Sequence, residues 1–176
     1  MGLGRRHRDL RQLLRAVRIL GEGTPRSSDA LLAFGETLSS RILRAALEEK
    51  GIRAGLVDAR KVVITDARHG AAEPDLAGIA EGARRWLIPA LERGETPVLG
   101  GFVGATREGR TTTLGRGGSD TSAAAIGSAL GAEEIQIWTD VDGLMSADPK
   151  LVPAARTLAR VSFAEAAELA HYGAKV

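Results

Sequence analysis

The chain has 176 residues, enough for one domain with a buried core, and its lack of cysteine excludes disulfides, thiolate nucleophiles and Cys-ligated zinc. Its 24 Lys and Arg against 22 Asp and Glu leave a formal net charge of +2, which gives no reason to expect nucleic-acid binding. The three histidines, His7, His69 and His171, form no HExxH-type pair, so we assign them neither a metal nor a catalytic role.

The first 20 residues have the spacing of an amphipathic helix. Six arginines between Arg5 and Arg18 are interleaved with Leu10, Leu13, Leu14 and Val17. Such a start also suits a membrane surface or a transit peptide, but it has no apolar h-region, and no continuous spanning segment follows anywhere. We therefore expect a cytoplasmic protein with no membrane partner. Residues 21–29 (GEGTPRSSD) are typical of a connector.

Helices and strands then alternate along the chain. Residues 38–47 keep helical spacing before Gly51, and residues 54–57 and 62–64 are short apolar runs with β-branched content that predict strands. A long helix is expected after Pro74, closed by Gly94, with a kink or an early end at Pro89.

The second half continues the alternation. Residues 97–103 predict a buried strand, a helix runs from near Asp120 to Gly131, and residues 135–138 predict another strand. Ser162 and Glu165 form a capping box for a last helix, with Gly173 at its C-cap. This order predicts an α/β fold, a three-layer α/β/α sandwich with a largely parallel sheet.

The most informative stretch is the glycine loop, residues 111–124 (TTTLGRGGSDTSAA). Gly115, Gly117 and Gly118 allow close backbone approach, and a following helix would offer an anion its N-terminal N–H groups. Ser119 or Asp120 could instead be the N-cap of that helix. Arg116 favours capture of a carboxylate or phosphate. The loop has neither the GK[ST] of a Walker A motif nor the order GxGxxG, so a P-loop or Rossmann site fits poorly.

A second stretch, residues 135–150 (IQIWTDVDGLMSADPK), runs from the expected strand into an acidic turn. Ligands of open α/β sheets bind beyond the carboxyl ends of strands, which places Thr139 and Asp140 at such a position. An EF-hand is excluded because its closing glutamate is absent, while a solvated turn remains the alternative. Glu36, where a loop is expected to meet a helix, and Lys175, beside Gly173, carry no information alone.

Taken together, these segments resemble aspartate kinases of the amino-acid kinase family. The resemblance runs from about Leu13 to Val176 and includes an uninterrupted GRTTTLGRGGSD at residues 109–120. Its other points are Phe34-Gly35-Glu36, the region from Asp58 to Asp66, Gly101-Phe102-Val103-Gly104, Trp138-Thr139-Asp140 and Tyr172-Gly173-Ala174-Lys175-Val176. The resemblance implies an amino-acid kinase (carbamate kinase-like) fold that is incomplete here, with residues 1–176 forming part of the catalytic domain.

The resemblance also implies residue roles. Glu36 meets the ammonium group of aspartate and Arg116 its α-carboxylate, while Phe102, Gly117, Gly118 and Ser119 complete that pocket. Asp120 is the catalytic-site residue. The nucleotide contacts are Thr139, Asp140, Met145, Lys150, Lys175 and Val176. ATP, with Mg²⁺ on the nucleotide, would phosphorylate L-aspartate in the biosynthesis of lysine, threonine, methionine and isoleucine, by a full-length enzyme expected to be a homo-oligomer.

Departures from the family pattern temper these implications. Family members begin with a KFGGTS-type strand whose lysine contacts the transferring phosphate, and they continue into an LHP-type segment and ACT-type regulatory domains. Lys150 stands where some relatives have arginine, and Met145 where a tyrosine often contacts the nucleotide. We therefore expect the 176 residues alone to be catalytically silent. The alternatives are another kinase of the same fold, such as an acetylglutamate or uridylate kinase, or a non-catalytic ligand-binding or dimerising remnant.

Overall fold

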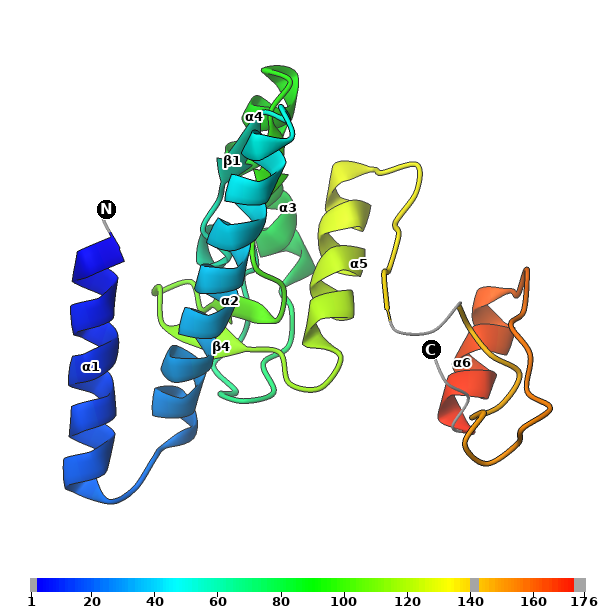
Figure 1. Ribbon diagram of the computed structural model, residues 1–176, viewed down its shortest axis with the longest axis horizontal. Helices are drawn as coiled ribbons and strands as arrows, with labels where there is room; N and C mark the ends of the chain where they lie inside the picture. Colours follow the sequence, from blue (N-terminus) through cyan, green and yellow to red (C-terminus); the bar gives the residue numbers. More distant parts are fainter. Residues whose placement is uncertain (1–2, 140–142, 173–176) are drawn as a thin grey trace. The chain divides into compact units, whose positions relative to one another are not determined.

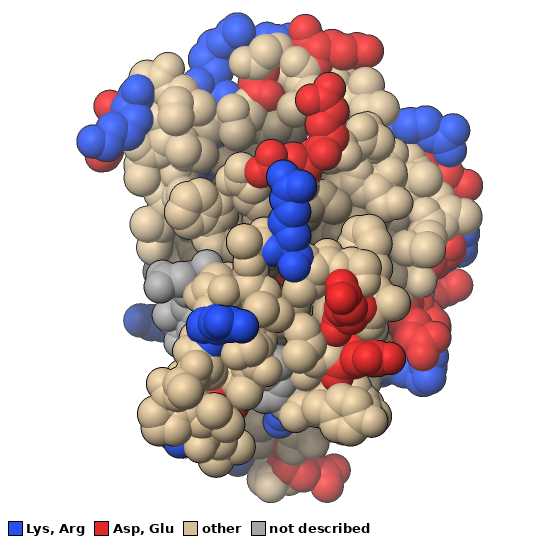
Figure 2. All heavy atoms as spheres, turned by 90° about the vertical axis from the view of Figure 1, so that its right-hand side faces the viewer, with Lys and Arg blue, Asp and Glu red and all other residues tan. Residues whose placement is uncertain are grey.

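The computed structural model of the chain describes residues 3–139 and 143–172. It divides into two compact units, Met1–Ile135 and Gln136–Val176, each described here by itself (Figure 1). Lysine and arginine side chains are interspersed with aspartate and glutamate on the face shown in Figure 2, in line with the balanced charge of the sequence. No helix of the described residues is long and apolar enough to cross a membrane.

Two helices open the first unit, α1 (Leu3–Leu20) and α2 (Pro25–Glu49). The amphipathic helix over residues 1–20 is thus confirmed for its described part. The connector is shorter than predicted, because α2 begins at Pro25 rather than after residue 29. Thr24 accepts a hydrogen bond from the Ser27 N–H, and Pro25 occupies the first helical position, where its missing N–H costs nothing.

Four short strands form two sheets. Strand β1 (Ala54–Leu56) pairs in parallel with β2 (Thr96–Val98), and β3 (Val103–Ala105) pairs antiparallel with β4 (Thr111–Thr113). Helix α2 packs against both β1 and β4 (Figure 1). The expected α/β class is confirmed, with the parallel pairing in β1 and β2 and an antiparallel hairpin in β3 and β4.

Two predicted strands differ in detail. The 3₁₀ helix η1 (Ala59–Lys61) ends just before residue 62. Instead of the strand predicted at residues 62–64, the structure has an isolated parallel bridge between Ile64 and Ala105. The single strand expected over residues 97–103 is divided into β2 and β3. Residues 100–102 bend between them, and this bend forms the centre of the site described below.

The core lies where three helices cover residues 62 and 63. Helix α3 (Leu76–Trp86) ends at Leu87, and α4 (Ile88–Glu92) follows with Pro89 in its first turn, which confirms the break predicted at that proline. Helix α5 (Gly118–Leu130) packs on α3 and ends at Gly131, whose φ of 62° suits glycine. The buried residues form two clusters, Val62 with Ala83 and Leu87, and Val63 with Ile79 and Ala125.

The second unit contains α6 (Phe163–His171) and the capping box predicted for it. Ser162 accepts from the Glu165 N–H, and the Glu165 carboxylate accepts from the Ser162 N–H, which lowers the pKa of Glu165. The C-cap is Tyr172, and the predicted cap Gly173 lies outside the described residues.

The strand predicted at residues 135–138 is wrong, because neither described sheet includes this segment. β-branched residues favour a strand only where a neighbour completes the ladder.

Candidate functional site

The bend at residues 100–102 passes between two helices that carry predicted site residues. A Cβ on Gly100 would lie 3.1 Å from the Glu36 Cβ on α2, and a Cβ on Gly101 would lie 3.0 Å from the Ser119 Cα on α5. A side chain at either position would force its neighbouring helix to shift, so glycine suits this close approach. The bend therefore brings Glu36 and Ser119 to its two sides, although 83 positions separate them in the sequence.

The sequence indicated that Glu36 lies where a loop meets a helix, in the first turn, and this is wrong. It lies in the middle of α2, half-buried, because the helix already begins at Pro25. Its carbonyl accepts a hydrogen bond of 2.7 Å from the buried Ser40 hydroxyl. The side chain of Glu36 lines a cavity of about 580 Å³, together with Arg41, Val57, Arg60 and Gly100 among others.

This cavity contains charges of both signs. Arg60 is held by two bonds to Asp58, of 2.6 and 2.9 Å, and this contact raises the pKa of Arg60. Arg41 differs, because its buried Nε has no hydrogen-bond partner among the described residues. A glutamate and an arginine whose Nε has no such partner therefore line the same hollow.

Phe102 has a backbone conformation that L residues rarely adopt. Its φ is 67°, the one positive value for a non-glycine residue among those described. The conformation is held from both sides, because its N–H donates to the Ser122 hydroxyl at 3.0 Å and its carbonyl accepts from the Leu114 N–H at 2.9 Å. Strain of this kind persists only where the surrounding structure over-determines it, and it is common in ligand sites.

Ser122 was not predicted from the sequence, yet it links the bend to α5. It is 2% exposed, and its hydroxyl also donates to the Gly118 carbonyl at 2.7 Å. Replacing Ser122 by alanine leaves the Phe102 N–H without this acceptor, so the free energy of unfolding should fall by about 1–3 kcal/mol. Urea denaturation measures it, with Ser128→Ala, an exposed serine of the same helix, as the control expected to stay within about 0.5 kcal/mol. Equal effects of the two substitutions would contradict the assigned bond.

The glycine loop enters α5 without a side-chain cap. Gly117, with a φ of 71°, is the N-cap, so the prediction of Ser119 or Asp120 at that position is wrong. A left-handed N-cap favours glycine. Among the described residues no side chain accepts from the first turn of α5, and its positive dipole end is open to an anion. Arg116, Ser119 and Asp120 are exposed around it.

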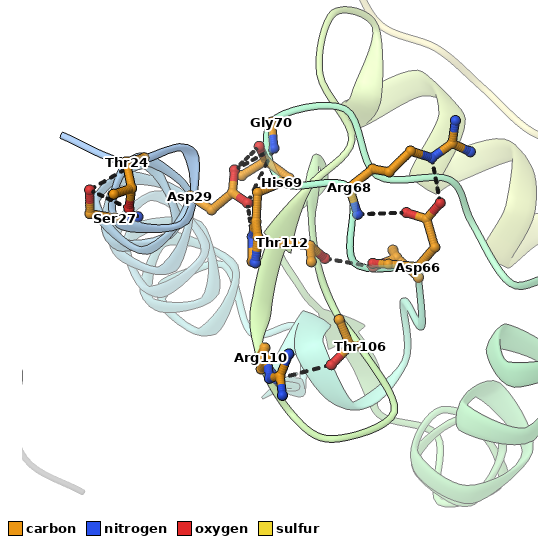
Figure 3. A network of polar contacts seen from close by, with 12 residues as sticks. Thr24, Ser27, Asp29, Asp66, Arg68, His69, Gly70, Thr106, Arg110 and Thr112 are labelled. Carbon is orange, nitrogen blue, oxygen red and sulfur yellow. Dashed lines mark hydrogen bonds and ion pairs between the residues drawn. The ribbon is translucent and has the colours of Figure 1, made fainter.

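A buried aspartate, Asp29, supports this loop from behind, and nothing in the sequence indicated it. Figure 3 shows its carboxylate facing His69 and Gly70, and it also accepts a bond of 2.5 Å from the Thr113 hydroxyl. His69, for which no metal or catalytic role was expected, has this buried carboxylate as its partner. Both residues are absent from the motifs of the family pattern quoted above.

The predicted nucleotide residues belong to the second unit or to undescribed positions. Met145 forms an isolated antiparallel bridge with Thr157, and the Lys150 N–H donates to Asp148 at 2.8 Å. Thr139 is the last described residue before the internal gap at residues 140–142. Asp140, Lys175 and Val176 lie outside the described residues. The nucleotide assignments therefore stay predictions.

The model of the "Amino acid kinase family" matches residues 3–176. The chain belongs to the amino acid kinase family. It is 43% identical over 173 residues to the lysine-sensitive aspartokinase 3 of Escherichia coli (strain K12), covering 96% of this chain and 38% of that protein. It is 44% identical over 154 residues to aspartokinase 1 of Bacillus subtilis (strain 168), covering 87% of this chain and 37% of that one.

Solved structures of this family agree with the fold. Escherichia coli aspartokinase III in complex with aspartate and ADP superposes with a TM-score of 0.84 at 41% identity, over 96% of this chain and 38% of that one. The aspartate kinase from Synechocystis gives 0.68 at 35% identity, over 93% of this chain and 26% of its own. The expected amino-acid kinase fold is confirmed, and the chain spans less than two fifths of these relatives.

Proposed function

We propose that this chain is part of the catalytic domain of an aspartate kinase, which transfers the γ-phosphoryl group of ATP to the β-carboxylate of L-aspartate. The observation that carries the proposal is the bend at residues 100–102, which places Glu36 on one side and Ser119 with the glycine loop on the other. The similarity to aspartokinases over nearly the whole chain supports the choice of substrate.

The charges at the bend suit an amino acid as the acceptor. An α-amino acid presents an ammonium group and a carboxylate a few ångströms apart, and Glu36 and Arg116 offer one charge of each sign. In this proposal Glu36 binds the ammonium group, and Arg116 binds the α-carboxylate with a bidentate pair. The first turn of α5 adds the N–H groups of Gly117 and Ser119, while the Gly118 N–H donates to the Gly115 carbonyl and Gly118 contributes a close backbone approach. Phe102 forms part of the wall.

The chemistry needs positioning more than proton transfer. The β-carboxylate of aspartate is ionised at neutral pH, so its oxygen can attack the γ-phosphorus without a strong base, while the bond to the ADP oxygen breaks. Charge neutralisation is then the main requirement, because two anions must approach each other. We assign to Asp120, exposed in the first turn of α5, the task of orienting positive groups rather than of removing a proton.

The nucleotide is assigned to the residues named by the family pattern in the second unit. Thr139, Asp140 and Met145 would contact the base or ribose, while Lys150, Lys175 and Val176 would lie near the phosphates. Mg²⁺ would arrive with the ATP phosphates, as hard cations of this kind usually do. We also expect the full-length enzyme to form a homo-oligomer.

An acceptor panel tests the proposal. The full-length gene product is incubated with MgATP, hydroxylamine and one acceptor at a time, namely L-aspartate, N-acetyl-L-glutamate or UMP. We expect ATP-dependent hydroxamate with aspartate, and neither hydroxamate nor ADP above background with the other two. ADP release stimulated by N-acetylglutamate or UMP would favour a sister kinase of the same fold. Calorimetric binding of aspartate and MgADP without any turnover would favour the non-catalytic remnant.

A further inference from the structure

Asp29 is a buried aspartate to which none of the roles proposed above is assigned. It lies in α2, seven positions before Glu36, and its side chain is 0% exposed. Its carboxylate accepts from the Gly70 N–H at 3.0 Å and the His69 Nδ1 at 2.6 Å (Figure 3), and also from the Thr113 hydroxyl at 2.5 Å. A carboxylate is costly to bury, and donors from separate segments compensate for that cost.

Two of these partners lie at the tip of a short closed loop, residues 66–73. The base of the loop is closed by the Asp66 N–H, which donates to the Glu73 carbonyl at 3.0 Å. The Asp66 carboxylate accepts from the N–H groups of Arg68 and Glu73, and its contact with the Arg68 side chain lowers the pKa of Asp66. The loop is therefore braced internally, and Asp29 holds it by its tip.

This loop in turn supports the glycine loop. The Ala72 N–H donates to the carbonyl of Thr113, near the start of the glycine loop, at 2.9 Å. Gly115 lies so close that a Cβ would be 3.0 Å from the Gly70 carbonyl oxygen. Asp29 therefore reaches the glycine loop by two routes, directly through the Thr113 hydroxyl and indirectly through Gly70. Arg116 is three residues beyond Thr113.

We propose that Asp29 is a positioning residue that fixes the glycine loop and thereby holds Arg116 in the arrangement that binds the acceptor. The substrate part of this inference rests on the proposed function, while the anchoring of the loop does not. Asp29 does not act on the reacting atoms, because its carboxylate is fully buried and already bonded to Thr113, Gly70 and His69. An apolar side chain could fill the same space, but it could not give the two segments a common acceptor.

Local hydrogen exchange separates anchoring from general stability. Asp29→Asn removes the charge, and Thr113→Val removes one donor with little change in shape. In both variants the amides of residues 111–118 should exchange about 10- to 100-fold faster, since a hydrogen bond to a charged group is lost. The amides of α3 in the same molecules serve as the internal reference and should keep their rates. Thr113→Ser keeps the hydroxyl and should behave like the unmodified protein.

Asp75→Asn is the matched control. Asp75 is also a hydrogen-bonded aspartate, and it accepts from the Gly78 N–H at the start of α3 at 3.0 Å. The Asp75→Asn variant should speed amide exchange in the first turn of α3 and leave the exchange rates of residues 111–118 unchanged. If α3 and the glycine loop respond alike to Asp29→Asn and Thr113→Val, or if the loop does not respond, the proposed anchor is overturned. If Asp29→Asn fails to fold, the comparison of Thr113→Val with Thr113→Ser still tests whether Asp29 anchors the glycine loop.

Kinetics then test the link to Arg116. The KM for aspartate should rise about 10-fold in Thr113→Val, with kcat and the KM for ATP nearly unchanged, and Thr113→Ser should restore it. Unchanged kinetics together with faster loop exchange would overturn the positioning role. A protein that phosphorylates no aspartate even without substitution would instead refute the proposed function, and hydrogen exchange alone would then decide the anchor.

Discussion

Replacing Arg116 by alanine in the full-length protein should raise the KM for aspartate about 10- to 100-fold and leave the KM for ATP nearly unchanged. Arg116 lies exposed between Gly115 and Gly117, and no described residue pairs with its guanidinium. The fork is thus available for a carboxylate, and its loss removes a charge-assisted bidentate contact. Steady-state kinetics with each substrate varied in turn measure the two constants.

Two further variants show whether geometry or charge matters. Arg116→Lys keeps the charge without the fork, so its KM should lie between those of the alanine variant and the unmodified enzyme. Arg110→Ala removes an exposed arginine just before β4 and is the charge-matched control, expected to leave both constants unchanged. Glu36→Gln should also raise the KM for aspartate selectively. Equal rises for aspartate and ATP in the Arg116 variant would contradict its assignment to the acceptor.

Replacing Gly82 by alanine should destabilise the first unit by about 1–3 kcal/mol. Helix α3 lies so close to the segment after η1 that a Cβ on Gly82 would be 2.7 Å from the Val62 Cα and 2.8 Å from the Lys61 carbonyl oxygen. These are backbone atoms, so no side-chain rotation relieves the overlap. The helix must move away from Val62, which opens the buried contact between Val62, Ala83 and Leu87.

Alanine is also a better helix former than glycine, which should raise the free energy of unfolding by up to about 1 kcal/mol. A second glycine without close neighbours measures this contribution alone. Gly35, in the interior of α2, has no atom within 4 Å of its added Cβ. Gly35→Ala should therefore leave stability unchanged or increase it by about 0.5–1 kcal/mol. Urea denaturation of both variants gives the comparison. If Gly82→Ala changed the free energy of unfolding by the same amount as Gly35→Ala, the close approach of α3 to Val62 would be refuted.

Features that depend on neighbouring residues could be predicted from the sequence. The break at Pro89, the end of α5 at Gly131 and the capping box of Ser162 with Glu165 each follow from the chemistry of a few adjacent residues. The start of α2 was missed although its signal is local. Thr24 before Pro25 is a good N-terminal pair, but the surrounding glycine and serines made the stretch look like a connector.

Features that depend on distant contacts could not be predicted. The bond between Asp29 and Thr113 spans 84 positions, and no spacing in the sequence relates the two. The strand expected at residues 135–138 failed for a similar reason, since a strand requires a partner that its own sequence does not specify. Arg116 stood out beside the glycines of its loop, whereas Glu36 was found only because the family pattern names it. That the bend lies between Glu36 and Ser119 emerges only from the fold.

The left-handed backbone of Phe102 limits which residues this position accepts. In the proposed function Phe102 forms part of the wall of the acceptor pocket, so a change of side chain there would alter both that wall and the cost of the conformation. Valine, isoleucine and threonine are the least compatible with this backbone, while asparagine and glycine relieve it but remove the ring. Thr37 and Arg41 line the cavity beside Gly100 from ordinary helical positions, so substitutions there change side chains without this backbone cost.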